Sequence, residues 1–361
     1  MGSETCPPQL PVIDFSNLEG NWKSVKSQVY EAVAEYGCFE AKVFDDKVPL
    51  ELRKAIFGAL EELFDLPLEK KKLSVSRLRF HGYVGHNNPM MPLFESIGID
   101  DADNFDKVNH MTNIWWPQGN PSLSKTVHSY TEKLSEFDQV VRKMILESLG
   151  LEKYMEEHIN STNSLIRFNK FESPQTSDTK LGLTAHTDAN FVTILYTNQV
   201  GGLQFMTKDE KWISYKPSPD TFVVLVGDSF HAWSNGRLHS PFHRVMMSGN
   251  EAKYTILSCS IPNKGYIIKA PEELVDEEHP LLYKPFDHFE YIDYRTTENV
   301  QTDKFHLRTF CVDPVVIGTK LGREDHGSIS RNCDLESAGT SDARTNLQIR
   351  LGGQEGQMLV V

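Results

Sequence analysis

Two histidines and one aspartate have the residue types and the spacing that could hold a metal ion. His186 and Asp188 lie two positions apart in the segment LGLTAHTDANFVTIL, and His243 opens the later segment HRVMM. On a β-strand, residues i and i+2 project from the same face, so the imidazole and the carboxylate could converge on one ion. His243, from a different strand, would complete a set of two histidines and one carboxylate. Such a set suits Fe(II) and leaves coordination positions open for other ligands.

The spacing of the first pair does not identify a metal site by itself. Triplets of the form His-x-Asp or His-x-Glu occur twice in the sequence, about as often as chance would place them among 13 histidines and 50 acidic residues. His186-Thr187-Asp188 leads into the apolar run at 191–196, whereas His288-Phe289-Glu290 lies in the mixed segment DHFEYIDY, where we expect an ordinary surface pair. His231 and His239 flank the turn segment SNG, and we expect them in polar loops, solvated or hydrogen-bonded.

A lysine and a threonine downstream of His243 could bind an anion. Lys253 and Thr255 are two positions apart at the start of a β-type run, so their side chains would share one face. A cation beside a hydroxyl on an inner face would suit a carboxylate ligand. Burial of a lone lysine without an anionic partner is costly, which favours such a ligand. The alternative is an edge-strand lysine that points to solvent.

The order of elements indicates how these residues are positioned. Apolar residues recur at helical spacing over 22–36, 52–64 and 127–149, and Gly150 closes the last stretch. Seven short strands are predicted after these helices, at 165–171, 191–196, 203–206, 212–215, 222–226, 243–247 and 254–261. Asn235-Gly236 predicts a tight turn between two of them. Strands at this spacing are typical of a sandwich or jelly roll, so the predicted fold class is mainly β with helical decoration (α+β).

The chain divides into three predicted regions. Residues 1–160 form a mostly helical region that packs on the core, and residues 161–315 form the jelly-roll domain. Residues 316–361 are predicted to be a disordered tail. After Phe310 the chain has no aromatic residue, and its Gly-, Ser- and charge-rich sequence cannot bury enough apolar surface to offset the entropy lost on ordering.

Composition narrows the class of protein. The chain has 361 residues, 39% of them hydrophobic, and a net charge of −13, so it can bury a core but presents no basic surface for nucleic acid. No apolar run approaches the roughly 18–20 residues of a membrane span, and the N-terminus does not read as a signal peptide. Five scattered cysteines, without a CxxC pair, favour free thiols in a reducing compartment. We therefore expect a cytoplasmic protein, with a monomer as the default state.

Together with the residues around it, the His186, Asp188 and His243 pattern resembles the sequences of the plant 2-oxoglutarate- and Fe(II)-dependent dioxygenases. The resemblance is carried by His-Thr-Asp, followed after 54 residues by His243-Arg244-Val245, with Gly227-Asp228, Ser234-Asn235-Gly236 and Ser240 in between. The segments PVIDFSNL, LFDLPLEKK and SLGLEKY are similar too, so the resemblance spans roughly Leu10 to Val312. GCFEA, MPLFESIGIDDAD and WWPQGNP resemble the AOP-type branch of plant specialised metabolism.

The resemblance implies a double-stranded β-helix (jelly roll) core and an oxidoreductase that incorporates oxygen from O2. His186, Asp188 and His243 match the family's iron ligands. Lys253 and Thr255 match the positions that meet the distal carboxylate of 2-oxoglutarate, and Asn169 and Phe171 lie in the matching cosubstrate segment. The implied reaction releases succinate and CO2 while it hydroxylates, demethylates or desaturates a small, largely apolar plant metabolite, with ascorbate in a supporting role.

Two residues depart from the family pattern. The family usually has Arg-x-Ser where this chain has Lys253-Tyr254-Thr255, and it often has a tyrosine at the position of Phe171. Lysine offers a compact charge in place of a planar fork, and phenylalanine cannot donate a hydrogen bond. We expect weaker binding of 2-oxoglutarate, by roughly 1–3 kcal/mol, rather than none.

The substrate pocket and the reaction class leave alternatives open. The pocket candidates are mostly apolar, namely Tyr83, Met90, Phe94, Phe168, Asn190, Phe191, Cys259 and Ile261, and His81 and His86 lie in a loop that could touch substrate. For each pocket candidate taken singly, plain core packing is the more common role. A binding-only relative, motivated by Lys253 and Phe171, and a zinc hydrolase built on the same triad are the two rival functions.

Overall fold

The computed structural model describes residues 9–42, 47–76, 81–85, 91–296 and 305–311. The predicted disordered tail at 316–361 lies outside these ranges, as do His86 and Met90. Of the five cysteines, Cys38, Cys259 and Cys311 are buried free thiols, while Cys6 and Cys333 lie outside the described residues.

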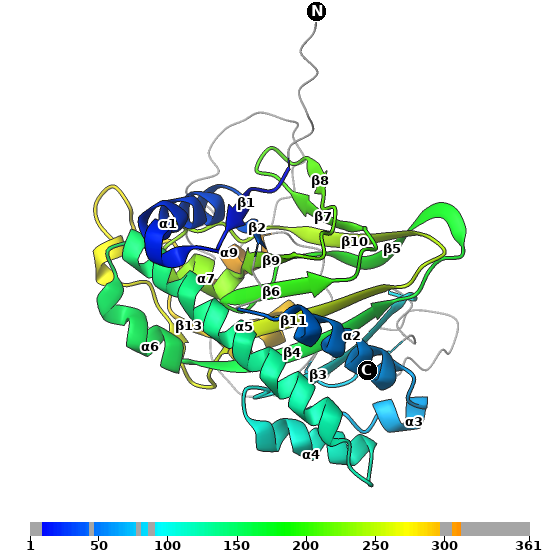
Figure 1. The fold of residues 1–361 in the computed structure, drawn as a ribbon. Helices are drawn as coiled ribbons and strands as arrows, with labels where there is room; N and C mark the ends of the chain where they lie inside the picture. The colour runs from blue at the N-terminus through cyan, green and yellow to red at the C-terminus, as the bar shows by residue number, and fades with distance from the viewer. Residues whose placement is uncertain (1–8, 43–46, 77–80, 86–90, 297–304, 312–361) are drawn as a thin grey trace, which may run out of the picture. The chain divides into compact units, whose positions relative to one another are not determined.

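Two antiparallel sheets form the centre of the described structure (Figure 1). The larger sheet has seven strands in the order β1-β2-β9-β6-β11-β4-β3, with β1 parallel to β2. The strands of this sheet are β1 (Val12–Asp14), β2 (Cys38–Lys42), β3 (Phe94–Asp100), β4 (Thr162–Phe171), β6 (Val192–Thr197), β9 (Thr221–Val226) and β11 (Lys253–Pro262). The smaller sheet has the order β5-β10-β7-β8, from β5 (Thr176–His186), β7 (Leu203–Met206), β8 (Trp212–Ser214) and β10 (His243–Gly249). A separate pair joins β12 (Ile267–Ile268) to β13 (Phe286–Asp287).

Helices cover the outer face of the larger sheet. Figure 1 shows the long helix α5 (Pro121–Ser148) lying across β6, β11 and β4. Asn120 caps its first turn by accepting the Leu123 N–H at 3.1 Å, Pro121 occupies that turn, and Gly150 follows its end at a φ of 70°. The other helices are α1 (Leu18–Glu35), α2 (Leu50–Phe64), α3 (Leu68–Lys71), α4 (Phe105–Trp115), α6 (Met155–Asn160), α7 (Asp228–Trp233), α8 (His288–Arg295) and α9 (His306–Cys311), with short 3₁₀ turns at Glu152–Tyr154 and Glu272–Leu274.

The two faces of the larger sheet have different surroundings. Ile166, Phe168, Ile194 and Ile256 point outward into one large apolar core with the helices. Phe171, Leu195 and Leu225 point inward, where they join Phe205, Val245 and Met247 of the smaller sheet in a second cluster. The polar residues of the candidate site share the same inner face.

The predicted elements are confirmed, and the structure adds helices and strands that were not predicted. All three predicted helices and all seven predicted strands are present. The strands at β3 and β5 were not predicted, because β5 mixes Thr, Lys and Gly in an exposed run and β3 lies beyond a loop-like segment. Asn235 and Gly236 do form a turn, with φ values of 49° and 76°, but it follows the unpredicted helix α7 and does not join two strands directly. Within the described part of the chain, no helix combines the length and apolar character that a membrane span requires.

Candidate active site

The side chains of His186, Asp188 and His243 converge on one point. His186 ends β5 and His243 begins β10, and the two residues are directly paired across these antiparallel strands. The Nε2 atoms of both histidines lie 3.8 Å from Asp188 Oδ1. All three ligand atoms lie within 4.8 Å of one another, and this is the one such group among the described residues. An ion placed between them would meet two imidazole nitrogens and one carboxylate oxygen.

The second nitrogen of each ring is already used. His186 Nδ1 lies 2.8 Å from the Thr184 carbonyl oxygen, and His243 Nδ1 lies 3.1 Å from that of Pro241. Because a carbonyl can only accept, each Nδ1 carries the proton and each Nε2 presents a lone pair toward the centre. Burial and the neighbouring His243 lower the pKa of His186 to about 4, so its ring is neutral at pH 7. The donor set therefore fits a divalent metal ion such as Fe(II).

Asp188 is held by a loop and not by the strand. β5 ends at His186, so the alternation expected on a strand does not apply to the aspartate. Its Oδ2 atom accepts a hydrogen bond from Thr193 Oγ1 at 2.6 Å, and Thr193 in turn lies 3.0 Å from the side-chain nitrogen of Asn190. With one carboxylate oxygen engaged, the other oxygen faces the two histidines.

A buried carboxylate, Asp228, fixes the loop that carries the ligands. Its backbone N–H donates to the Asp188 carbonyl at 2.7 Å, and its side chain accepts from Thr187 Oγ1 at 2.8 Å. Ser240 Oγ and Tyr291 OH also donate to this carboxylate, each at 2.7 Å. Gly227 permits the approach, because a Cβ there would lie 2.2 Å from the Asn190 carbonyl oxygen.

The C-terminal helices contribute charge to the same carboxylate. Arg295 lies 3.4 Å and His306 3.3 Å from Asp228 Oδ2, and Arg295 also donates to the Thr187 carbonyl at 2.7 Å. Burial alone would raise the pKa of Asp228, but the hydrogen bond and charge of His306, with Arg295 and Tyr291, hold it well below its usual range. Asp228 is therefore an anion that ties α8 and α9 to the metal-binding loop.

Lys253 is buried on the inner face of the larger sheet, which answers the alternative of a solvent-facing lysine. Only 1% of the residue is exposed, and its Nζ lies 2.7 Å from both Thr197 Oγ1 and the Val200 carbonyl oxygen. Thr255 is buried beside it, 3.4 Å from the same Thr197 hydroxyl. No carboxylate of the described residues lies within ion-pair distance of Lys253. Desolvation lowers the pKa of its ammonium to about 7.

Asn169 and Phe171 lie next to this lysine on the neighbouring strand. In the β4–β11 register, Phe171 is opposite Lys253 and Asn169 is opposite Thr255. Asn169 Oδ1 accepts from Ser96 Oγ at 2.6 Å, while the Phe171 ring packs on Phe94 with centroids 5.1 Å apart. The structure thus brings the four residues expected to meet 2-oxoglutarate into one patch.

The pocket candidates fall on both faces of the sheet. Cys259 and Ile261 point inward in a small cluster with Leu165, and Cys259 Sγ lies 3.8 Å from Thr193 Oγ1. The Asn190 side-chain nitrogen donates to Thr193 Oγ1, the hydroxyl that in turn donates to Asp188. Phe94 is inward but packed in the second apolar cluster, and Tyr83 donates to Glu95. Phe168 and Phe191 belong to the outer core, on the side away from the triad.

Three other histidines considered in the sequence have structural partners in the described residues. His288 is buried, with Nδ1 3.1 Å from Ser229 Oγ, so the prediction of a surface pair with Glu290 is wrong for the histidine. Its sequence neighbours gave no sign of burial, because Asp287 and Phe289 are half-buried and Glu290 is exposed. His231 lies in α7 and is hydrogen-bonded to Tyr283 OH at 2.7 Å. His81 is paired with Asp100.

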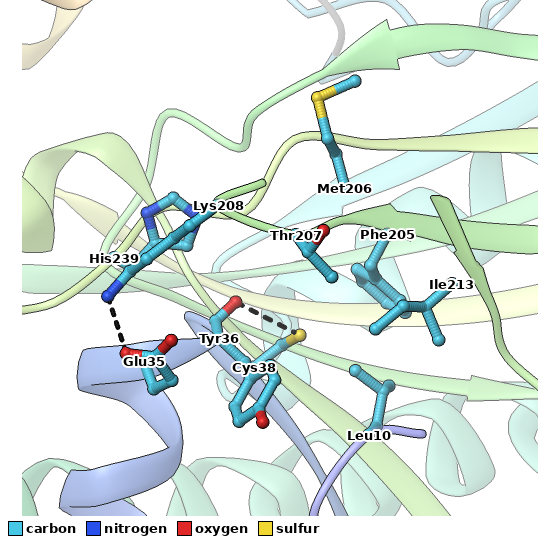
Figure 2. A pocket seen from close by; sticks show the side chains of 10 residues that line it. All are labelled: Leu10, Glu35, Tyr36, Cys38, Phe205, Met206, Thr207, Lys208, Ile213 and His239. Atoms are coloured by element: carbon cyan, nitrogen blue, oxygen red, sulfur yellow. Dashed lines mark hydrogen bonds and ion pairs between the residues drawn. The ribbon is translucent and has the colours of Figure 1, made fainter. Parts of the chain in front are cut away.

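A separate small hollow lies away from these residues. Figure 2 shows it between the start of the chain's first strand, the end of α1 and the β7–β8 hairpin, with Lys208 and Glu35 paired at 2.9 Å on its rim. Its lining is Leu10, Glu35, Tyr36, Cys38, Phe205, Met206, Thr207, Lys208, Ile213 and His239. None of the three triad residues lines it.

Several supporting residues were not singled out from the sequence. Thr193, Thr197, Tyr291 and Arg295 act through contacts between segments far apart in the chain, and no local pattern marks them. Asp228 and Ser240 carried a signal, since both belong to the motif that resembled the dioxygenases. In the structure, Ser240 donates to the Asp228 carboxylate, and Asp228 holds the loop that carries Asp188.

Comparisons with known proteins agree with this geometry. Residues 162–260 match the 2OG-Fe(II) oxygenase superfamily, and residues 10–115 match the N-terminal family described as non-haem dioxygenase in morphine synthesis. The chain is 50% identical over 325 residues to the probable 2-oxoglutarate-dependent dioxygenase AOP1.2 of Arabidopsis thaliana, covering 86% of this chain and 99% of the relative.

Solved structures show the same fold. The Arabidopsis thaliana dioxygenase for auxin oxidation 1, in a complex with 2-oxoglutarate, is 28% identical with a TM-score of 0.68, covering 75% of this chain and 100% of that one. The rice dioxygenase for auxin oxidation is 30% identical with a TM-score of 0.69, covering 80% and 95%. The two sheets are therefore the double-stranded β-helix, and this chain belongs to the 2-oxoglutarate- and Fe(II)-dependent dioxygenases, in the AOP branch.

Proposed function

We propose that this dioxygenase holds Fe(II) with His186, Asp188 and His243 and binds the distal carboxylate of 2-oxoglutarate at Lys253 and Thr255. When bound, the iron and 2-oxoglutarate together activate O2 and couple release of succinate and CO2 to oxidation of a substrate C–H bond. The observation that carries the proposal is the buried Lys253 ammonium, which lies on the same sheet face as Thr193, the residue that holds Asp188, and has no carboxylate partner among the described residues.

The chain's own residues hold and orient the reactants. The Nδ1 hydrogen bonds to Thr184 and Pro241 keep both imidazoles neutral and aimed at the metal position. Thr193 holds Asp188 by its outer oxygen. The cation and hydroxyl of Lys253 and Thr255 supply charge and hydrogen bonding for a carboxylate. Asn169 borders this patch as a further contact for the cosubstrate.

The substrate is a small, largely apolar plant metabolite in this proposal. Leu165, Cys259 and Ile261 form the apolar inner surface nearest to Thr193 and the triad. The similar structures named for auxin oxidation act on a small plant molecule, which supports the same class here. A cytoplasmic monomer that needs no membrane or nucleic acid completes the proposal, in keeping with the acidic composition.

The test is addition of 2-oxoglutarate to the Fe(II)-loaded protein without oxygen. A saturable visible charge-transfer band is expected, because a keto acid chelates the iron in this arrangement. The same preparation in air should release CO2 from 2-oxoglutarate. Iron bound without a band at millimolar cosubstrate would contradict the proposal and favour the binding-only relative. Retention of zinc in place of iron, with no CO2 release, would favour the hydrolase.

A further inference from the structure

We propose that Arg167 is a specificity-determining residue that binds a carboxylate of the organic substrate, so that the substrates of this enzyme are small apolar carboxylic acids. The inference rests on the proposed oxygenase function and adds the chemical class of the substrate. It assigns to Arg167 a ligand separate from the 2-oxoglutarate that Lys253 is proposed to bind.

Arg167 lies on the inner face of the larger sheet. Its neighbours in β4, Ile166 and Phe168, are buried in the outer core, so the alternation of a strand directs Arg167 inward. The residue is opposite Leu257 on β11 and Gly98 on β3. A Cβ at Gly98 would lie 2.2 Å from the His81 carbonyl oxygen, so the segment that contains His81 passes over the strand beside this arginine.

One nitrogen of the Arg167 guanidinium has no hydrogen-bond partner among the described residues. Its Nη2 donates to Ser96 Oγ at 2.5 Å, and Ser96 connects it to Asn169 of the proposed cosubstrate patch. Its Nη1 is buried and has no hydrogen-bond partner among the described residues. Burial lowers the pKa of the Arg167 guanidinium to about 10, which leaves it charged at pH 7, and the charges of Asp100 and Asp188 act on it only from beyond ion-pair distance.

Apart from Lys253, the fully buried cations of the described structure are matched by carboxylates. Arg53 lies 3.3 Å from Asp220, Lys71 lies 2.7 Å from Glu95, and Arg142 lies 2.6 Å from Asp138. A buried charge without a partner is costly, and these three cations meet that cost with carboxylates of the protein. Among described residues Arg167 has no such carboxylate, which indicates that its anion comes from a ligand.

The surroundings of Arg167 limit what that ligand can be. Leu165, Cys259 and Ile261 lie on the same face, with Phe289 packed against them, and they form an apolar surface next to the guanidinium. Cys259 Sγ lies 3.8 Å from Thr193 Oγ1, and Thr193 donates to Asp188. This apolar surface therefore extends to the metal site. A guanidinium presents a planar fork that matches a carboxylate. An apolar body with one carboxylate fits both features.

Binding of matched acids and amides tests the proposal. Protein loaded with Fe(II) and saturating 2-oxoglutarate, without oxygen, would be titrated by calorimetry with phenylacetate, 3-phenylpropionate and hexanoate, and with their neutral primary amides. We expect at least one acid to bind about tenfold more tightly than its amide, because a charge-assisted pair replaces a neutral one. The acid should also shift the charge-transfer band, since it binds beside the metal.

Three variants assign the preference to Arg167. In Arg167→Gln the acid and its amide should bind within about twofold of each other, Arg167→Lys should retain part of the preference, and the exposed Arg308→Gln should retain all of it. A wild-type protein that does not prefer any acid over its amide, including one that binds neither, would overturn the inference, as would a full preference in Arg167→Gln.

The cosubstrate band separates this inference from the proposed function. A normal 2-oxoglutarate band in Arg167→Gln shows a folded variant with an intact metal site, so that a lost acid preference belongs to Arg167. Loss of the band in the wild-type protein would instead contradict the proposed function.

Discussion

The two faces of the seven-stranded sheet are made by the same strands but have opposite character. On the outer face, Ile166, Phe168 and Ile256 are packed beneath helices in a continuous apolar core. On the inner face, Lys253 and Arg167 are cations without carboxylate partners among the described residues, and Thr193 of the same face holds Asp188 of the triad. The outer face is closed by helices, whereas the inner face carries charge that the described residues leave unmatched. The proposed function uses the side of the sheet where burial and charge are unmatched.

The largest effect should come from the outer face, through stability. Phe168→Ala removes a fully buried ring from the core and should lower the free energy of unfolding by about 3–5 kcal/mol, measured by urea denaturation. Iron affinity of the folded fraction should stay unchanged. The matched change at the 58%-exposed Phe305 should cost no more than about 0.5 kcal/mol. If Phe168→Ala weakened substrate binding while leaving stability intact, Phe168 would belong to the pocket and the contrast between faces would fail.

The next effect concerns a metal ligand of the inner face. His243→Ala should weaken Fe(II) binding by roughly 2.5–4 kcal/mol, which is one quarter of the 10–16 kcal/mol typical of a four-ligand zinc site. Calorimetric titration with Fe(II) would measure this loss, and CO2 release from 2-oxoglutarate should disappear. The exposed His279→Ala variant should bind iron normally. Unchanged iron affinity in His243→Ala would place the metal elsewhere.

A substitution at Asp228 tests whether the residues that hold the ligand loop contribute to Fe(II) affinity in addition to the ligands themselves. Asp228→Asn removes the anion that accepts from Thr187 and Tyr291, and outer contacts of this kind typically change metal affinity by about 10–100-fold. The same Fe(II) titration measures it, with the exposed Asp209→Asn as the matched change. A loss of stability without any loss of iron affinity would reduce Asp228 to a purely structural role.

The smallest effect separates lysine from arginine at the cosubstrate position. Because burial lowers the pKa of Lys253 to about 7, the free protein loses this charge as pH rises, and the apparent KM for 2-oxoglutarate should increase between pH 7 and 9. Lys253→Arg keeps its charge throughout this range, so it should lower the KM by roughly five- to tenfold at pH 9, or about 1–1.4 kcal/mol.

The ratio of the two KM values at each pH serves as the control, since effects on iron or substrate cancel in it. A ratio that does not change with pH would show that Lys253 stays protonated or does not meet the carboxylate. The same lowered pKa predicts that the ligand-free protein gains stability as pH rises from about 7 toward 10.5, because the unfolded state then binds more protons than the folded state.

Prediction from sequence succeeded where the signal is local. The periodicity of α1, α2 and α5 and the apolar runs of β4 to β11 needed no knowledge of distant contacts, apart from β5, whose exposed mixed residues hide its alternation. The triad was recognised through its context, although Asp188 reaches the metal position from a loop and not from a strand. Phe168 and Phe191 show the limit, because an aromatic residue in a strand has the same sequence signal on either face.

The sequence by itself determined the residue types of the metal site and the order of three helices and seven strands. It also determined that Lys253 and Phe171 stand in place of the residues usual in the family. Only the tertiary structure decided that Lys253 is buried without a carboxylate, that Asp228 ties α8 and α9 to the ligand loop, and that Arg167 points inward. The physical reason is that a strand alternates its side chains whatever covers them. Which face becomes core and which becomes site depends on helices and strands that arrive from distant parts of the chain.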